Sequence, residues 1–303
     1  MTRAAPDSRD PPTGHSLIAT AVAVLIGAQV GVQLTITRSL ADDIAPGTLA
    51  FFRYSLAFLI LAPFAFPAYR VPFRGRDLLP IAGLGVAMFG LMIALQNLAL
   101  HYTPSGRGAL IFSTMPFFTM IFAAWFGGDP LTRPKVVGVA LTISGVAIVI
   151  GADAFETAPT AASWLGDGLM IFCAIVAGLC SVLFRPYVRR YTALPVSALA
   201  VFCAIFPLWV ISALEGGIVR LPTYSASTWT WVAVLGMTSA LFYWLWLWAL
   251  GRASPTRVTS WIALSPITAS VLGALLLGEP LGTTFLLGLA CVALGIWLAH
   301  RPA

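Results

Sequence analysis

The sequence predicts an all-α membrane protein of ten transmembrane helices, arranged as two inverted-topology five-helix repeats with cytoplasmic N- and C-termini. Three observations predict this fold class: an apolar composition, ten apolar runs, and a pattern that recurs after 150 residues. The 303 residues are 59% hydrophobic and only 9% charged, with a mean hydropathy of +0.92. A soluble protein carries about a quarter charged residues, so lipid is the expected surrounding of most of this surface.

The composition also excludes several classes of protein. The net charge of +6 does not indicate nucleic-acid binding, because the basic residues are scattered between apolar runs and include a single lysine, Lys135. Four cysteines lie inside apolar runs without a C-x-x-C pair, so we expect neither a metal site nor a redox motif. The chain has no G-x-x-x-x-G-K-[ST] motif, and we expect no cofactor and no ATPase activity.

A helix needs about 20 mainly apolar residues to cross a bilayer. The polar, proline-rich residues 1–16 are expected to form a disordered cytoplasmic tail. The first apolar run is too long for a signal-peptide core and has no clear cleavage site, so it is predicted to remain as a helix. In chain order, the predicted helices are 17–36, 47–68, 78–99, 106–126, 134–151, 166–185, 195–214, 229–249, 257–277 and 283–299.

The basic residues predict the orientation of these helices. Thirteen of the 17 arginines and lysines fall in tails and loops on the side of the N-terminus, and three fall on the other side. Basic residues concentrate on the cytoplasmic side of a membrane. Both termini should therefore be cytoplasmic, with 152–165 as an extracytoplasmic linker and 300–303 as a second cytoplasmic tail.

Two segments that start 150 residues apart repeat each other without gaps, "GDPLTRPKVVGVALTISGVAIVI" from Gly128 and "GEPLGTTFLLGLACVALGIWLA" from Gly278. The matched pairs include Arg107 with Arg257, Pro116 with Pro266, Gly138 with Gly288, and Gly145 with Gly295. This register predicts an internal duplication into repeats over 17–151 and 166–299. Each repeat holds five helices, an odd number, so the second repeat enters the membrane with the opposite orientation, as in many secondary transporters.

The repeated segments, from Ala99 and from Ala249, resemble the EamA family of the drug/metabolite transporter superfamily. The matching residues are Ala99, Leu100, Tyr102, Pro116, Gly128, Leu131, Gly138 and Gly145, with Pro266, Gly278, Glu279, Leu281, Gly288 and Gly295 in the second copy and Phe52-Arg53 in the second helix. The chain departs from the family pattern with Asp129 in place of Glu and Arg252 in place of Tyr. The resemblance implies a basket of ten helices with helices 3, 4, 8 and 9 around a central cavity and helices 5 and 10 at the periphery.

Polar and aromatic side chains within the helices are the candidates for lining that cavity, because polar groups in hydrocarbon turn toward protein or water. Gln29 and Gln33 share one helix face, and Met88, Met92 and Gln96 share another. The remaining candidates are Asn97 beside Gln96, Thr238, Phe242 and Trp246 at the equivalent positions of helix 8, and Tyr243, Ser260, Trp261 and Ser265. Ordinary packing and interhelical hydrogen bonds are the alternative for each of them.

Four further residues have possible roles in charge recognition or movement. Arg53 could attract a carboxylate or extend to the outer interface. His101 could act as a gate. Pro116 and Pro266 each remove a hydrogen bond in mid-helix, and are candidates for symmetric hinges or for static bends.

None of the eleven acidic residues lies deep in a predicted helix, which leaves facilitated diffusion and coupling through His101 or a helix-end acid both open. Glu279 is expected at the start of the last helix, where its charge suits the helix dipole.

The resemblance implies a transporter of small molecules, most similar to bacterial exporters of amino acids, particularly aromatic ones. Export of drugs or another metabolite is the alternative. An intramembrane lipid enzyme would need a catalytic cluster that the sequence lacks. The oligomeric state is left open, and a monomer is plausible.

Overall fold

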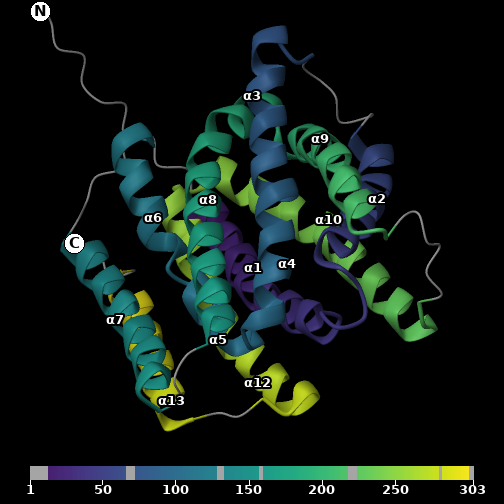
Figure 1. Ribbon diagram of the computed structural model, residues 1–303. Helices are drawn as coiled ribbons and strands as arrows, with labels where there is room; N and C mark the ends of the chain where they lie inside the picture. The colour runs from purple at the N-terminus through teal and green to yellow at the C-terminus, as the bar shows by residue number, and fades with distance from the viewer. Residues whose placement is uncertain are drawn as a thin grey trace, which may run out of the picture.

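The computed structural model describes residues 13–65, 72–127, 133–156, 160–217, 224–279 and 282–299, and every regular element in these ranges is helical. In lipid, a helix is favoured because it satisfies its own backbone hydrogen bonds. Figure 1 shows a bundle with α1 in its interior and the α7–α13 pair at one side. The predicted disordered tail lies largely outside the described residues, and α1 begins at Thr13 rather than at residue 17.

The first half of the chain forms α1 (Thr13–Ser39), α2 (Pro46–Ala65), α3 (Gly75–Gly85), the π-helix η1 (Val86–Leu91), α4 (Met92–Tyr102), α5 (Ser105–Phe112), α6 (Met115–Phe122), the π-helix η2 (Ala123–Gly127) and α7 (Arg133–Glu156). The second half forms α8 (Ala161–Tyr191), α9 (Ala193–Leu214), α10 (Ala226–Arg252), α11 (Pro255–Ser260), the 3₁₀ turn η3 (Trp261–Leu264), α12 (Ser265–Leu277) and α13 (Thr283–Ala299).

Eight continuous helical stretches of the described chain are long and apolar enough to cross a membrane. They correspond to the predicted helices 1–4 and 6–9, and shorter apolar stretches, Val136–Ile148 and Thr283–Gly295, lie at the predicted fifth and tenth positions. Several helices are longer than predicted. In particular α8 covers 161–191, which replaces part of the expected linker with helix.

Two helices are interrupted at equivalent places in the 150-residue register. The first break, at Ser113 and Thr114, separates α5 from α6, and the second, η3, separates α11 from α12. Pro116 and Pro266 each stand in the first turn of the helix that follows the break, rather than in mid-helix as expected. A proline is well accommodated there because the first N–H groups of a helix have no intrahelical partner.

Glycines allow α1 to lie against the interrupted stretch formed by α11, η3 and α12. A Cβ atom on Gly27 would lie 1.9 Å from the carbonyl oxygen of Trp261, and one on Gly31 would lie 2.4 Å from that of Ser265. Such distances leave no room for any side chain, so the two backbones are in direct contact. This contact fixes the position of α1 relative to η3 and α12.

The α7–α13 pair is held by a reciprocal glycine contact. A Cβ atom on Gly145 would lie 2.6 Å from the Gly288 carbonyl oxygen, and one on Gly295 would lie 2.4 Å from the Gly138 carbonyl oxygen. The four residues form two pairs in the 150-residue register. The contact therefore places equivalent surfaces of the two halves against each other, as a two-fold relation requires.

Replacing Gly27 by Ala should destabilise the protein, because the new methyl group would overlap the Trp261 carbonyl and force α1 away from η3. Overpacking of this kind costs about 1–3 kcal/mol. The matched control is Gly83→Ala in α3, where a Cβ atom would have no neighbour within 4 Å. Thermal unfolding in detergent should show a lower midpoint for Gly27→Ala than for the wild-type protein, and an unchanged midpoint for the control. Equal midpoints for the two variants would contradict the close contact.

Candidate functional site

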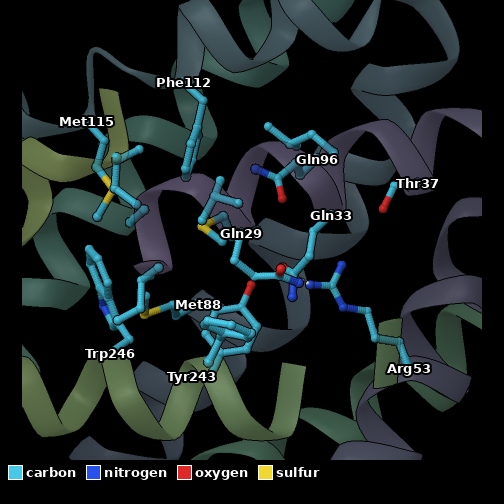
Figure 2. Close-up of a pocket in the computed structure, with 17 residues that line it drawn as sticks. Gln29, Gln33, Thr37, Arg53, Met88, Gln96, Phe112, Met115, Tyr243 and Trp246 are labelled. Atoms are coloured by element: carbon cyan, nitrogen blue, oxygen red, sulfur yellow. Dashed lines mark hydrogen bonds between the residues drawn. The ribbon is translucent and has the colours of Figure 1, made fainter. Parts of the chain in front are cut away.

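A cavity lies in the interior of the bundle between elements of both halves of the chain (Figure 2). In this conformation the cavity has a volume of about 50 Å³. Ligand pockets usually measure about 300–1,000 Å³. The cavity in this conformation is therefore smaller than a typical ligand pocket, and it would have to widen to hold a small organic molecule.

Nine of the residues singled out in the sequence line this cavity: Gln29, Gln33, Arg53, Met88, Met92, Gln96, Phe242, Tyr243 and Trp246. Eight others were missed by sequence reasoning: Ile26, Val30, Leu34, Thr37, Phe112, Met115, Ala177 and Ile262. The lining therefore comes from helices 1, 2 and 6 of the predicted order as well as from helices 3, 4, 8 and 9. Among the residues that the structure describes, none from the α7–α13 pair lines the cavity.

The α1 face supplies six of the 17 lining residues, all at helical spacing from Ile26 to Thr37. Thr37 follows Gln33 by one turn, so continuing the Gln29–Gln33 pattern would have found it. Phe112 and Met115 gave no such signal. They flank the break between α5 and α6, where regular periodicity no longer tells which way a side chain faces.

The methionine and amide face of the third predicted helix passes through η1. Met88 lies in this π-helical turn, and Met92 and Gln96 follow in α4. A π-turn inserts a wider step into an α-helix and is frequently found at functional sites. All three side chains line the cavity, and their residues are at most 7% exposed.

Arg53 is held inside the protein by polar side chains from two other helices, rather than extending to the membrane interface. Its residue is 2% exposed. Its Nε donates to Ser239 Oγ at 2.6 Å, and its Nη2 donates to Gln33 Oε1 at 2.7 Å. The guanidinium carbon also lies 5.5 Å from the Tyr54 ring centroid and 6.0 Å from that of Tyr243. Hydrogen bonds and aromatic faces thus stabilise the charge where it borders the cavity.

Five candidates are not among the lining residues and have other surroundings. Asn97 Nδ2 donates to the Pro46 carbonyl at 3.0 Å, and Thr238 Oγ1 accepts from Gln33 Nε2 at 3.4 Å. Ser260 Oγ donates to the Arg257 carbonyl at 2.8 Å. The Trp261 side chain packs against the main hydrophobic core, and Ser265 is fully buried. In this conformation Asn97 and Thr238 therefore make interhelical hydrogen bonds, Ser260 bonds within its own helix, and Trp261 and Ser265 are packed among other residues.

The remaining candidates also lie outside the lining. His101 is in the last turn of α4, half-buried beside Tyr102. Pro116 and Pro266 are buried at the two helix breaks, with the cavity residues Met115 and Ile262 close to them in the chain. A change of angle at either break would therefore move part of the lining.

Glu279 caps a helix, but not the one expected. Its carboxylate accepts from the Ser105 backbone N–H at 2.8 Å, from the Ser105 hydroxyl at 2.7 Å, and from Gly106 N–H at 3.4 Å. These groups belong to the N-terminus of α5, whose free N–H groups attract a negative charge. Glu279 therefore connects the end of α12 to the start of α5, instead of only serving the start of α13.

Glu215 plays the same part for α2. Its carboxylate accepts from Gly47 N–H at 2.8 Å and from Thr48 N–H at 2.7 Å, and the Thr48 hydroxyl donates to it at 2.8 Å. Glu215 follows the last turn of α9, so this bond joins the C-terminal end of one helix to the N-terminal end of another. Two helices of the first half, α2 and α5, thus begin on carboxylates supplied by the second half.

Two further carboxylates are neutralised at helix ends. Arg107 Nε donates to Asp167 at 3.1 Å, and a second guanidinium nitrogen completes the ion pair. Asp77 pairs with Arg190 at 2.7 Å and accepts from the Tyr191 hydroxyl. None of these acids lines the cavity, and within the described ranges no three His, Cys, Asp or Glu side chains are grouped as a metal site would need.

The fold is that of a multi-pass helical membrane protein with an internal cavity. The model of the EamA-like transporter family matches residues 17–151 and again 164–301, so the chain belongs to that family and is a transporter rather than an enzyme.

Named relatives agree with this assignment. A probable terminal-alkyne amino-acid exporter of Streptantibioticus cattleyicolor is 29% identical over 262 residues, 86% of each chain. A probable amino-acid metabolite efflux pump of Salmonella typhimurium is 26% identical over 293 residues, 91% of this chain and 93% of that one. A solved crystal structure with 17% identity covers 96% of this chain and 97% of its own, with a TM-score of 0.70, and so has the same fold.

Replacing Glu279 by Gln should weaken the α12–α5 connection, because one amide oxygen cannot replace a charged carboxylate that accepts three bonds. We expect a loss of about 1–2 kcal/mol of stability, within the range for helix caps, seen as a lower unfolding midpoint. Asp42→Asn is the control, since Asp42 is exposed and accepts no hydrogen bond from the described residues. A Glu279→Gln midpoint as high as the control would show that the cap is not stabilising.

Proposed function

We propose that this protein is a secondary transporter of a bacterial inner membrane that exports amino acids, aromatic ones included, by alternating access. The observation that carries the proposal is the internal cavity between the two halves, lined by amide, sulfur and aromatic side chains. Secondary transporters built from inverted repeats bind their cargo at such an interface. The printed names of two relatives, an amino-acid exporter and an amino-acid metabolite efflux pump, support the cargo class.

Ten spans in two inverted repeats are part of the same proposal. Three observations support it: the family model matches the chain twice, the helix breaks before Pro116 and Pro266 are equivalent, and the α7–α13 glycine contact is reciprocal. Rocking of one half against the other would open the contracted cavity to one side at a time. The two breaks adjoin the lining, so bending there is the proposed source of the movement.

The lining favours cargo that combines polar groups with an apolar side chain. Gln29, Gln33 and Gln96 offer amide donors and acceptors, and Trp246, which is 3% exposed, has an indole N–H that finds no hydrogen-bond partner among the described residues. Met88, Met92 and Met115 can adapt their shape to different apolar groups. That adaptability is also the observation in favour of the second candidate function, export of drugs or another small metabolite.

The purified protein in liposomes should carry labelled phenylalanine down its concentration gradient, and an imposed pH gradient should not change the rate. The reason is that Asp77, Asp167, Glu215 and Glu279 are bound to other groups, and in the part of the chain that the structure describes no acidic side chain lines the cavity. Flux that requires a pH gradient would contradict facilitated export. Absence of flux for every amino acid would contradict the cargo but not the transporter class.

Replacing Gln96 by Leu should lower phenylalanine flux several-fold without lowering folded yield, because one lost hydrogen bond to the cargo is worth about 0.5–1.5 kcal/mol. Ser144→Ala is the matched control, since Ser144 lies in α7 and bonds only to the Ala140 carbonyl of its own helix. Unchanged flux in Gln96→Leu would remove this residue from the cargo site.

A further inference from the structure

Arg53 is only 2% exposed, and its partners differ from those of two other arginines, half-buried Arg107 and exposed Arg190, which bind carboxylates. Arg107 pairs with Asp167, and Arg190 pairs with Asp77. The Arg53 guanidinium is bound instead by two neutral oxygens, on Gln33 and Ser239, and within the described ranges it has no ion pair. Its positive charge is therefore solvated by the protein but not neutralised by it.

An unneutralised charge at this depth has an energetic consequence. Buried charges in proteins are normally paired with an opposite charge. The free-energy cost of removing a charged group from water is far larger than the stabilisation that neutral hydrogen bonds provide. The Tyr54 and Tyr243 rings add cation–π attraction, which reduces the cost but leaves the net charge. Where such a group borders a cavity, it makes that cavity attractive to an anion.

The hydrogen bonds to Ser239 and Gln33 also orient the guanidinium. They occupy two of the five N–H donors of an arginine and lock the plane of the group. Figure 2 shows the side chain entering from α2 with its guanidinium turned toward Gln33 and the cavity. A fixed arginine fork is the arrangement that matches a carboxylate, which it can bind with two parallel hydrogen bonds.

The cavity is polar at one end and apolar at the other. In Figure 2, Arg53, Gln33, Gln96 and Thr37 lie on one side, whereas Met115 and Trp246 lie on the opposite side. The lining residues that the structure describes include no aspartate or glutamate, so they offer a charged partner for an anion but none for an ammonium group. An amphiphilic anion would satisfy both ends at once.

We propose that Arg53 binds the carboxylate of the cargo, and that this carboxylate, not the α-ammonium group, is what the site requires. The inference rests on the proposed transport function and deepens it by naming the recognised group. The apolar part of the cargo lies toward Trp246 and Met115. The cargo class is therefore carboxylates with an apolar side chain, of which aromatic amino acids are one member.

The test uses phenylalanine and two matched analogues. 3-Phenylpropionate keeps the carboxylate and lacks the amine, whereas phenylalaninamide keeps the amine and replaces the carboxylate with a neutral amide. Each is titrated into the purified full-length protein by calorimetry, which avoids the passive leak of these compounds through liposomes. We expect 3-phenylpropionate to bind within a few-fold of phenylalanine, and phenylalaninamide to bind on the order of 10- to 100-fold more weakly.

Variants of Arg53 test the residue itself. Arg53→Gln should lose on the order of 10- to 100-fold in affinity for both carboxylates and little for phenylalaninamide, so that the preference disappears. Arg53→Lys keeps the charge and should keep the preference at lower affinity. If Arg53→Gln does not fold, Ser239→Ala replaces it: this change removes the Nε acceptor and should lower carboxylate affinity selectively.

The outcomes separate the inference from the function on which it rests. Equal affinity of the wild-type protein for phenylalanine and phenylalaninamide would overturn the inference while leaving amino-acid export intact. Binding of 3-phenylpropionate without binding or flux of phenylalanine would support the inference and contradict amino-acid cargo. If Arg53→Gln still prefers carboxylates, a group other than Arg53 binds the carboxylate of the cargo.

Discussion

A polar group inside a bilayer has to be satisfied by the protein, because the surrounding hydrocarbon offers no partner, and this constraint shapes each level of the structure. It accounts for the helical backbone throughout the described ranges. At the first helix break, the Ser113 and Thr114 hydroxyls donate to the carbonyls of Leu110 and Ile111, which replaces part of the lost bonding. At helix starts, Glu215 and Glu279 perform the equivalent task for free N–H groups. Arg53 obeys the same rule with neutral partners, which leaves its charge available to the cavity.

The same contacts that satisfy these groups also join the two halves of the chain. Glu279 and Glu215 come from the second half and hold helices of the first, while Arg53 of α2 is bound by Ser239 of α10. The α1 backbone lies directly against the interrupted α11–η3–α12 stretch at Gly27. The cavity is consequently bounded by both halves and adjoins both helix breaks, so relative movement of the halves would change its size and its opening.

Much of this arrangement could be predicted from the sequence, because apolar length and helical periodicity are local properties. The eight long spans and the cavity-lining pairs Gln29–Gln33 and Met88–Met92 follow from them. The partners of charged residues could not be predicted, since they depend on contacts between distant segments: Glu279 meets a helix start 174 residues earlier. The inward direction of the Arg53 side chain could not be predicted from the sequence either. The position of a residue within a helix indicates its depth in the membrane, but not which neighbours its long side chain contacts. The segment "GDPLT" of the sequence repeat lies outside the described residues.

The central claim is that the cavity is a transport route that opens to each side of the membrane in turn. Thr37, which is 3% exposed and lines the cavity, can be replaced by cysteine in a variant whose four native cysteines are removed. Labelling by a membrane-impermeant thiol reagent is then measured in right-side-out and in everted vesicles. Alternating access predicts labelling from both sides, slowed in both by phenylalanine. Labelling from one side only, at a rate that phenylalanine does not change, would contradict the account.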